Sequence, residues 1–397
     1  MSLSSRSAVV VAVGITQTLA WASSYYLPAM LAAPMAKDLG IETPTVFAAF
    51  SFALVISAFL GPYAGRCIDR WGGRPVLMVT NLIFAAGLSL LGMAQSLTEL
   101  LLAWAFLGVG MGCGLYEAAF ASLVRLYGRD SRSAITGITL FAGFASTVGW
   151  PLSTVLDAHF GWRGACFCWA ALHLVIGLPL NALLPKAAAV GCVPNTAAET
   201  TLPSSASSPL RASVLLSVVF AITWFVSTAM AAHLPRLLMA GGATLAAAVA
   251  FGALVGPAQV GARILEFGLL RKVHPLLSAR LATLMHPAGA ALMAMAGAPL
   301  AALFVIFHGA GNGILTIAKG TLPLVLFGPQ GYGARQGLLM VPARMAQALA
   351  PWIFGLCLDR WGAGALWLSG GLGLIAFFAL MLLRAEGSSE SDASMRS

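Results

Sequence analysis

Charge is scarce in this chain. Charged residues make up 9% of the 397 positions, and hydrophobic residues make up 59%, whereas a soluble globular domain carries roughly 25% charged residues. No soluble fold of this length buries so much apolar surface, because even a large domain leaves much of its surface in water. The composition therefore excludes a soluble protein and predicts an all-α integral membrane protein.

Sequence patterns for cofactors and catalysis are missing as well. The six cysteines show no metal-ligand spacing, and the chain has no Gly-x-x-x-x-Gly-Lys-Ser/Thr loop to hold a nucleotide phosphate. No carboxylate, His or Ser cluster has a catalytic spacing near a membrane surface. We therefore expect no metal, no cofactor, no ATP-driven pumping and no enzyme activity.

Long apolar runs make up most of the sequence. A helix needs about 20 mainly apolar residues to cross a bilayer. The runs predict twelve transmembrane helices, near residues 8–34, 45–65, 75–95, 98–124, 134–156, 164–184, 212–238, 244–270, 278–297, 299–325, 334–357 and 362–383.

The net charge of +9 is spread between these runs rather than gathered in one patch, so we expect no nucleic-acid partner. With the N-terminus inside, fifteen Lys and Arg lie in cytoplasmic segments, against four on the other side: Lys37, Arg163, Arg236 and Arg360. This positive-inside bias predicts that both termini are cytoplasmic. We expect a multi-pass protein of the cell inner (plasma) membrane.

A Ser-, Thr-, Pro- and Ala-rich stretch separates the sixth and seventh predicted spans and is typical of a flexible linker. The predicted organisation is an N-terminal six-helix bundle over 1–184, a cytoplasmic linker over 185–211 and a C-terminal six-helix bundle over 212–397 with a short disordered tail. We expect a monomer.

The two halves repeat each other. The Gly-x-Gly-x-Gly steps that begin at Gly108 and Gly309 align, and such internal similarity indicates duplicated architecture. A finer repeat places two apolar residues and an acid at the end of every third span, at Asp69, Asp157, Glu266 and Asp359. Spans two and eight exit to the cytoplasm and spans five and eleven exit outside. The phrase Asp-Arg-Trp-Gly, which begins at Asp69 and again at Asp359, thus marks both membrane faces.

The stretch "GRCIDRWGGRP" resembles the loop signature between spans two and three of the major facilitator superfamily, with Gly65, Asp69, Arg70, Gly72 and Arg74 in the matching places. "FGWRGACF" is similar to a stretch often found before span six of that family. The resemblance implies two pseudo-symmetric six-helix bundles that work by alternating access.

The resemblance also implies that Asp69 braces the start of span eleven. On physical grounds, glycine at 65 lets helices approach closely, Gly72 permits a tight turn, and Arg125 is the expected ion partner of Asp69. A loop-capping ion pair without a gating role is the alternative. Arg360, beside Asp359, belongs to the corresponding external cluster.

Ionisable groups inside spans are costly and therefore functional candidates. Arg344 lies about 15 Å along span eleven from the cytoplasmic end, at 1.5 Å per residue. Its guanidinium can bind a carboxylate through two hydrogen bonds, so we expect it to hold an anionic substrate; packing against neighbouring helices is the alternative.

Glu117 and Lys319 occupy nearly equivalent places in the two halves. They are expected to face each other across the central cavity, or each to be neutralised within its own half. Glu117 is the candidate for proton coupling, because burial favours the protonated form of a carboxyl group. His308 is a second candidate, since histidine titrates near physiological pH.

Further candidates follow from spacing along helices. Arg263 and Glu266 share a helix face, and their surroundings echo span two, so we interpret them as a degenerate gate motif. Gln17, Trp21 and Tyr25 give span one a mixed polar and aromatic lining suited to a small organic ligand, or to hydrogen bonding between helices.

The sequence thus predicts a secondary transporter of a small organic solute, favouring an organic anion or carboxylate because Arg344 and Lys319 are positive. Coupling to a proton gradient is open. The alternative is proton-driven efflux of drugs or other toxic compounds.

Overall fold

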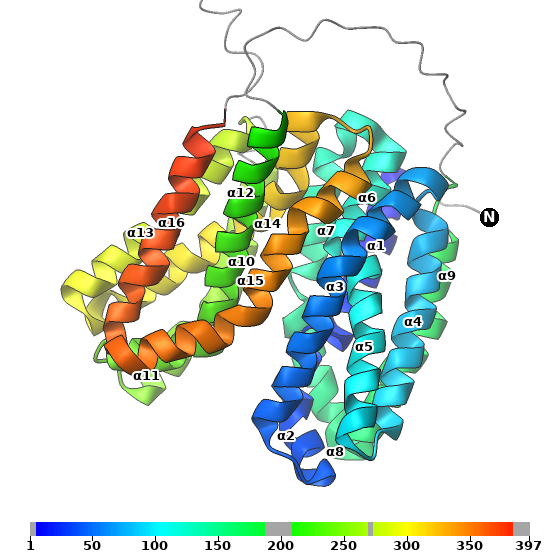
Figure 1. The fold of residues 1–397 in the computed structure, drawn as a ribbon, viewed down its shortest axis with the longest axis horizontal. Coiled ribbons are helices and arrows are strands. Elements are labelled where there is room, and N and C mark those ends of the chain that lie inside the picture. The colour runs from blue at the N-terminus through cyan, green and yellow to red at the C-terminus, as the bar shows by residue number, and fades with distance from the viewer. Residues whose placement is uncertain (1–4, 187–208, 269–272, 384–397) are drawn as a thin grey trace, which may run out of the picture.

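The computed structural model describes residues 5–186, 209–268 and 273–383. Helices account for nearly all of these residues, and within those ranges there is no β-strand. Figure 1 shows two groups of helices, one from each half of the chain. The prediction of an all-α fold is confirmed.

The first half forms one bundle. Its helices are α1 (Arg6–Ser23), α2 (Leu27–Leu39), α3 (Thr43–Trp71), α4 (Gly73–Met93), α5 (Leu97–Gly114), α6 (Tyr116–Tyr127), α7 (Arg132–Ala142), α8 (Ala145–Leu172) and α9 (Leu178–Ala182). Gly161, whose φ of 67° is left-handed, breaks α8 between the predicted fifth and sixth spans. A π-helical turn, His173–Gly177, joins α8 to α9.

The second half forms the other bundle. Its helices are α10 (Pro209–Ala240), α11 (Leu245–Gly252), α12 (Val255–Gly268), α13 (Pro275–Ala296), α14 (Ala301–Phe327), α15 (Tyr332–Trp361) and α16 (Ala365–Met381). Short 3-10 turns precede α14 and α16.

Eight helical stretches of the described chain are long and apolar enough to cross a membrane. Four of these stretches contain internal breaks and so hold more than one helix: Arg6–Leu39, Leu97–Ala182, Leu245–Gly268 and Tyr332–Met381. The helix bounds agree with a multi-pass membrane protein, and the count of twelve spans stays a prediction.

Each half has its own hydrophobic core. One core runs from Val9 to Leu184, with two residues added from the second half, while the other two cores lie wholly between Ala212 and Leu383. The predicted bounds of the bundles stay predictions. Most of the predicted linker, 187–208, and the predicted tail, 384–397, lie outside the described residues.

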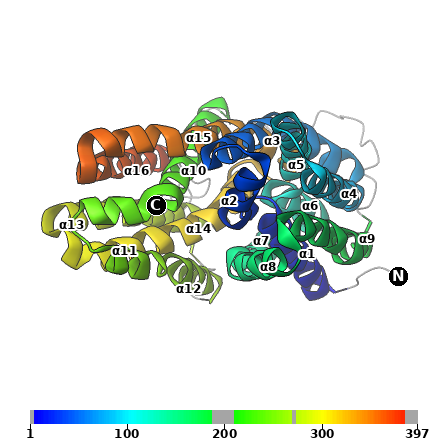
Figure 2. The same ribbon diagram turned by 90° about the horizontal axis from the view of Figure 1, so that it is seen from below.

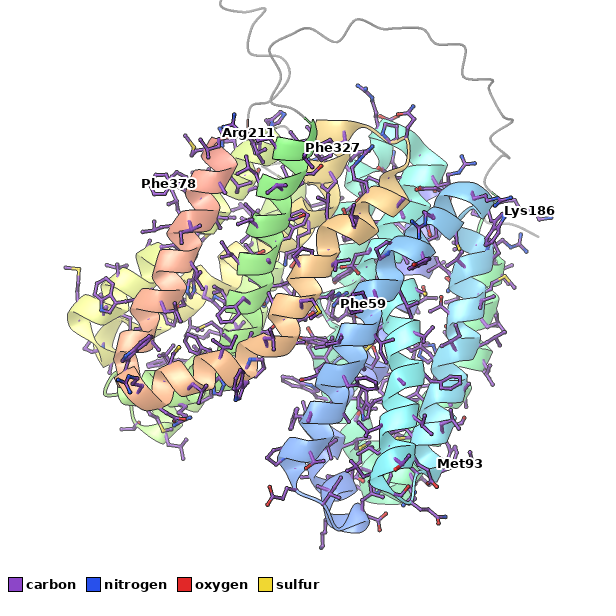
Figure 3. The ribbon with its side chains drawn as sticks, in the orientation of Figure 1. Phe59, Met93, Lys186, Arg211, Phe327 and Phe378 are labelled. Carbon is purple, nitrogen blue, oxygen red and sulfur yellow. The ribbon has the colours of Figure 1, made fainter. Side chains whose placement is uncertain are left out.

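One end of the molecule can be recognised from the linker. Lys186 and Arg211, which flank residues 187–208, lie at the upper end in Figure 3, and Met93 lies at the lower end. On the predicted orientation the upper end is cytoplasmic, and we call it the cytoplasmic end and the opposite one the external end.

The two bundles meet along α3 and α15, which lie side by side in Figures 1 and 2. Glycines let these helices touch through their backbones: a Cβ atom on Gly337 would lie 2.5 Å from the carbonyl oxygen of Gly61. Toward the external end the bundles part, where α2 packs on α3 and α8 of its own bundle and α11 packs on α10 and α14 of the other.

Candidate solute-binding and gating site

A buried ion pair joins the two bundles. Arg344 of α15 donates from Nη2 to Oε2 of Glu117 in α6 at 2.9 Å, and the two side chains are 4% and 13% exposed. A second guanidinium nitrogen of Arg344 donates to Oε1 of Gln347 at 3.0 Å. The chain breaks at Leu115 between α5 and α6, so Glu117 lies in the first turn of α6, where the positive end of the helix dipole favours a carboxylate.

The ion partner of Glu117 differs from the one that the sequence indicated. The sequence indicated that Glu117 faces Lys319, but the ion pair that the structure forms is with Arg344. Lys319 lies nearby, within electrostatic range of both Glu117 and Arg344, and its ammonium group is 4.0 Å from the centre of the Trp224 ring. All three ionisable groups therefore belong to one central cluster.

Aromatic side chains surround this cluster. Trp21 of α1 and Trp224 of α10 are nearly parallel, with ring centroids 6.3 Å apart and planes at 7°. The ring centroid of Trp21 lies 4.8 Å from that of Tyr116 and 5.2 Å from that of Tyr25. The predicted aromatic lining from span one thus lies beside the ionisable groups, as expected.

Gln17 also lies near the centre, where its Nε2 donates to the carbonyl oxygen of Gly114 at 2.7 Å. This bond is the one that the alternative interpretation of span one predicted. Because Gly114 is the last residue of α5, the contact ties α1 to the break that orients Glu117.

Sequence reasoning missed Trp224. It lies in an apolar run of α10 that carries no ionisable residue for several turns. The repeat was the available signal, because Trp224 stands at nearly the repeat distance from Trp21.

The residues predicted to gate the cytoplasmic end lie where the two bundles touch. Asp69, at the end of α3, accepts hydrogen bonds from the backbone N–H groups of Gly333 (2.9 Å) and Ala334 (2.8 Å) in the first turn of α15. Asp69 therefore braces the start of the predicted span eleven, as the family resemblance implied. The Asp69–Arg125 pair stays a prediction.

The glycines of this motif do what their positions predicted. A Cβ atom at Gly65 would overlap the carbonyl group of Gly333, so only glycine allows α3 and α15 to touch here. Gly72 has a φ of 83° and ends α3 one residue before α4 begins. Arg70 lies at the exposed helix end with its guanidinium 5.6 Å from the Trp71 ring, and Arg74 stands in the first turn of α4.

A second connection between the bundles lies at the same end. Arg263 donates to the carbonyl oxygen of Thr139 at 3.0 Å, and Glu266 accepts from Arg132 at 2.9 Å. Both acceptor–donor pairs join α12 to the N-terminal bundle, which agrees with the interpretation of Arg263 and Glu266 as a gate motif. Arg132 was not among the predicted site residues.

The external cluster behaves differently. Asp359, near the end of α15, forms an ion pair with Arg236 of α10, so both partners belong to the C-terminal bundle. Both side chains are more than half exposed, and Arg360 is exposed as well. The expected external latch between bundles is therefore not formed by Asp359 in this structure.

His308 lies away from the central cluster. Its Nδ1 is 3.0 Å from Nδ1 of His286, and both rings are buried between α13 and α14. The two histidines line a cavity of about 30 Å³ inside the C-terminal bundle. His308 thus lies among residues of the C-terminal bundle, and its role in proton coupling stays a prediction.

Curated relatives match parts of the chain. Monocarboxylate transporter 11 of Mus musculus is 33% identical over 150 residues, which cover 36% of this chain and 31% of the relative. The 4-hydroxybenzoate transporter PcaK of Pseudomonas aeruginosa is 30% identical over 173 residues, covering 43% and 38%. These matches span less than half the length of either relative. An uncharacterised 38 kDa protein of Thermoproteus tenax is 27% identical over 89% of both chains.

Solved structures share the fold. The human organic anion transporter MFSD10 superposes with a TM-score of 0.72 at 16% identity, covering 95% of this chain and all of that one. The outward conformation of the transporter FucP gives a TM-score of 0.71 at 15% identity, covering 94% and 98%. The sequence profile of the Major Facilitator Superfamily matches residues 13–328. With the doubled bundle and the motif that braces α15, these matches lead to one conclusion: the chain is a transporter that belongs to the Major Facilitator Superfamily.

Proposed function

We propose that this transporter is a secondary carrier of a small organic anion, and that Arg344 binds the anionic group. The observation that carries the proposal is the Glu117–Arg344 ion pair, buried where the two bundles meet. A buried guanidinium needs a counter-ion, and here a carboxylate on the other bundle supplies it. A carboxylate on the solute offers Arg344 the same two-oxygen acceptor.

The charges of the central cluster favour an anion. Arg344 and Lys319 are two basic side chains, and Glu117 is the carboxylate beside them. An anionic solute adds a second acidic group to this site. A cationic solute would add a positive charge instead.

The bundles are joined differently at the two ends of the molecule, and this difference supports transport by alternating access. In this structure the bundles are joined at the cytoplasmic end through Asp69 and Glu266, while Asp359 at the other end pairs within its own bundle. We infer a state closed to the cytoplasm. In the opposite state the bonds of Asp69 to Gly333 and Ala334 break. We also propose that the protein lies in the inner (plasma) membrane with both termini in the cytoplasm.

Proton coupling is proposed through Glu117. When a solute carboxylate takes its place on Arg344, the Glu117 carboxylate loses its ion partner and its protonated form is favoured. Glu117→Gln is expected to abolish uptake driven by a pH gradient and to keep solute exchange, measured in proteoliposomes. Gradient-driven uptake at the wild-type rate would contradict the coupling.

The anion proposal is tested by thermal stabilisation of the purified protein with a panel of organic anions and cations. A bound solute raises the unfolding temperature of the native state. Anions are expected to stabilise the wild type and an Arg360→Gln control, whose side chain is exposed. They should not stabilise the Glu117→Gln/Arg344→Gln double variant, which lacks both members of the pair.

Equal stabilisation of wild type and double variant by anions would reject Arg344 as the anion site. Stabilisation by cations alone would favour the second candidate function, proton-driven efflux of drug-like compounds. That candidate has one observation in its favour: the multidrug resistance protein fnx1 of Schizosaccharomyces pombe is 32% identical over 114 residues, or 28% of this chain.

A further inference from the structure

Two indole rings from opposite bundles face each other beside the anion site. Trp21 belongs to α1 and Trp224 to α10, and their planes differ by 7°. The guanidinium carbon of Arg344 is 6.0 Å from the centre of the Trp21 ring and 5.2 Å from that of Trp224. A ligand whose carboxylate binds Arg344 therefore places the rest of its body against these rings.

Several hydrogen-bond donors at this place have no acceptor among the described residues. Nε1 of Trp21, Nε1 of Trp224 and Nε2 of Gln347 are all buried and unpartnered. Trp21 is 3% exposed and Gln347 is fully buried. An unpaired buried donor costs free energy, so these three donors favour a ligand that carries hydrogen-bond acceptors, as a carboxylate does.

The geometry constrains the shape of that ligand. The rings are stacked with centroids 6.3 Å apart, and because they belong to different bundles, any rocking of the bundles changes their separation. Flat π-systems stack on the faces of such rings, and each aromatic pair contributes beyond its buried area. A puckered aliphatic ring offers no such face.

We propose that the solute is a planar aromatic monoanion, with its carboxylate on Arg344 and its ring stacked on Trp21 and Trp224. This inference rests on the proposed anion transport and adds the chemical class of the solute. The negative charge of the solute suits a cluster with two basic side chains, Arg344 and Lys319, and the solute ring bridges the indoles of both bundles. Binding of the solute therefore depends on how the two bundles are placed relative to each other.

The test compares matched pairs of acids that differ only in aromaticity. Benzoate is compared with cyclohexanecarboxylate, and 2-naphthoate with decahydro-2-naphthoate, by the dissociation constant that each gives in thermal-shift titration of the full-length protein in detergent. Benzamide, which is neutral, and terephthalate, which is a dianion, test the charge.

The aromatic acid of each pair is expected to bind about tenfold more tightly than its saturated partner, the size of effect that aromatic stacking supplies. Benzamide and terephthalate are expected to bind more weakly than benzoate. In Trp224→Leu the preference for the aromatic acid should fall to about threefold, since one of the two stacking faces is lost. Trp352→Leu, which changes an exposed tryptophan of α15, should keep the preference.

The possible failures are distinct. If no carboxylate binds, the proposed anion transport is overturned together with this inference. If aromatic and saturated acids bind equally, or if Trp224→Leu keeps the full preference, the aromatic inference is overturned and anion transport stands. Should Trp224→Leu not fold, Trp21→Leu removes the other indole, and Trp224→Phe is expected to retain part of the preference.

Discussion

The two ends of α15 show how one sequence phrase serves different contacts. At its start, Asp69 from the first Asp-Arg-Trp-Gly phrase holds the backbone of Gly333 and Ala334 and so links the bundles. At its end, Asp359 from the second phrase pairs with Arg236 of the same bundle and stays exposed. The acid is the same, but its partner depends on what packs against the helix end.

The glycine four residues before each phrase shows the same difference. A Cβ atom at Gly65 would overlap the backbone of Gly333 across the bundle interface, whereas one at Gly355 would lie 3.4 Å from the His233 ring, an ordinary contact. At Gly65 the two bundles therefore touch through their backbones, whereas Gly355 faces a side chain of its own bundle.

The largest expected effect lies between these ends, at the central ion pair. Glu117→Gln leaves the buried Arg344 charge unpaired and should lower the free energy of unfolding by about 3–5 kcal/mol. Adding Arg344→Gln should restore most of that loss. Denaturant titration in detergent measures both, with Arg236→Gln at the exposed external pair expected to cost less than about 1 kcal/mol. Equal losses of unfolding free energy at the central and the external ion pair would contradict this difference between a buried and an exposed pair.

Closure by backbone packing is tested at the two glycines. Gly65→Ala should disfavour the closed cytoplasmic end by about 1–3 kcal/mol, because the added methyl group forces α3 and α15 apart. Transport in proteoliposomes should fall accordingly, by about 5- to 150-fold if the closed state limits the rate. Gly355→Ala is the matched control and should transport at close to the wild-type rate. A similar loss in both variants would show that the helix contact is not the cause.

The two acids allow a finer comparison. Asp69→Asn replaces a charged acceptor at the N-terminus of α15 by a neutral one, which should weaken closure by about 1 kcal/mol. Asp359→Asn should change stability by less than about 1 kcal/mol, since its ion pair is exposed. The readout is labelling of a cysteine introduced at Ala334 by a membrane-impermeant thiol reagent from the cytoplasmic side. Faster labelling is expected with Asp69→Asn alone.

The smallest effect is a pH dependence at the cytoplasmic end. Nδ1 of His274 caps α13 by accepting from the N–H of Leu276, which requires a neutral ring. Burial, with Arg132 and Arg280 nearby, lowers the pKa of His274 below its ordinary value of 6.5. Because the folded pKa is depressed, the contribution to stability is complete above about pH 6.5 and is lost as the pH falls below it.

Replacing this histidine by another capping residue tests that assignment. His274→Asn keeps a cap and should flatten the dependence of the unfolding temperature on pH between about 5 and 7. An unchanged slope would place the dependence on another group.

Much of the fold could be predicted because it follows from one-dimensional quantities. Apolar runs predicted the membrane helices, and the duplicated glycine and acid patterns predicted paired bundles. The orientation inferred from the charges stays a prediction. The depth of Arg344 could be counted along its helix. The contact of Asp69 with the start of α15 came from the family resemblance.

The partners in the central cluster could not be predicted in the same way. Glu117 was expected to meet Lys319 because the repeat aligns them, but its ion partner is Arg344. His308, a candidate for proton coupling, contacts His286 inside the C-terminal bundle, a partner that the sequence did not indicate. Both outcomes depend on how each helix is rotated about its axis, and helices that are apolar on every side carry no periodic pattern to reveal that rotation.

The sequence by itself determined that this protein lies in a membrane and that its halves repeat, since composition and residue patterns act along the chain. Only the tertiary structure decided that Trp224 faces Trp21, that Glu117 neutralises Arg344, and that Asp359 leaves the external end unlatched. Those contacts join helices far apart in sequence, and their geometry is set by the packing of two bundles against each other.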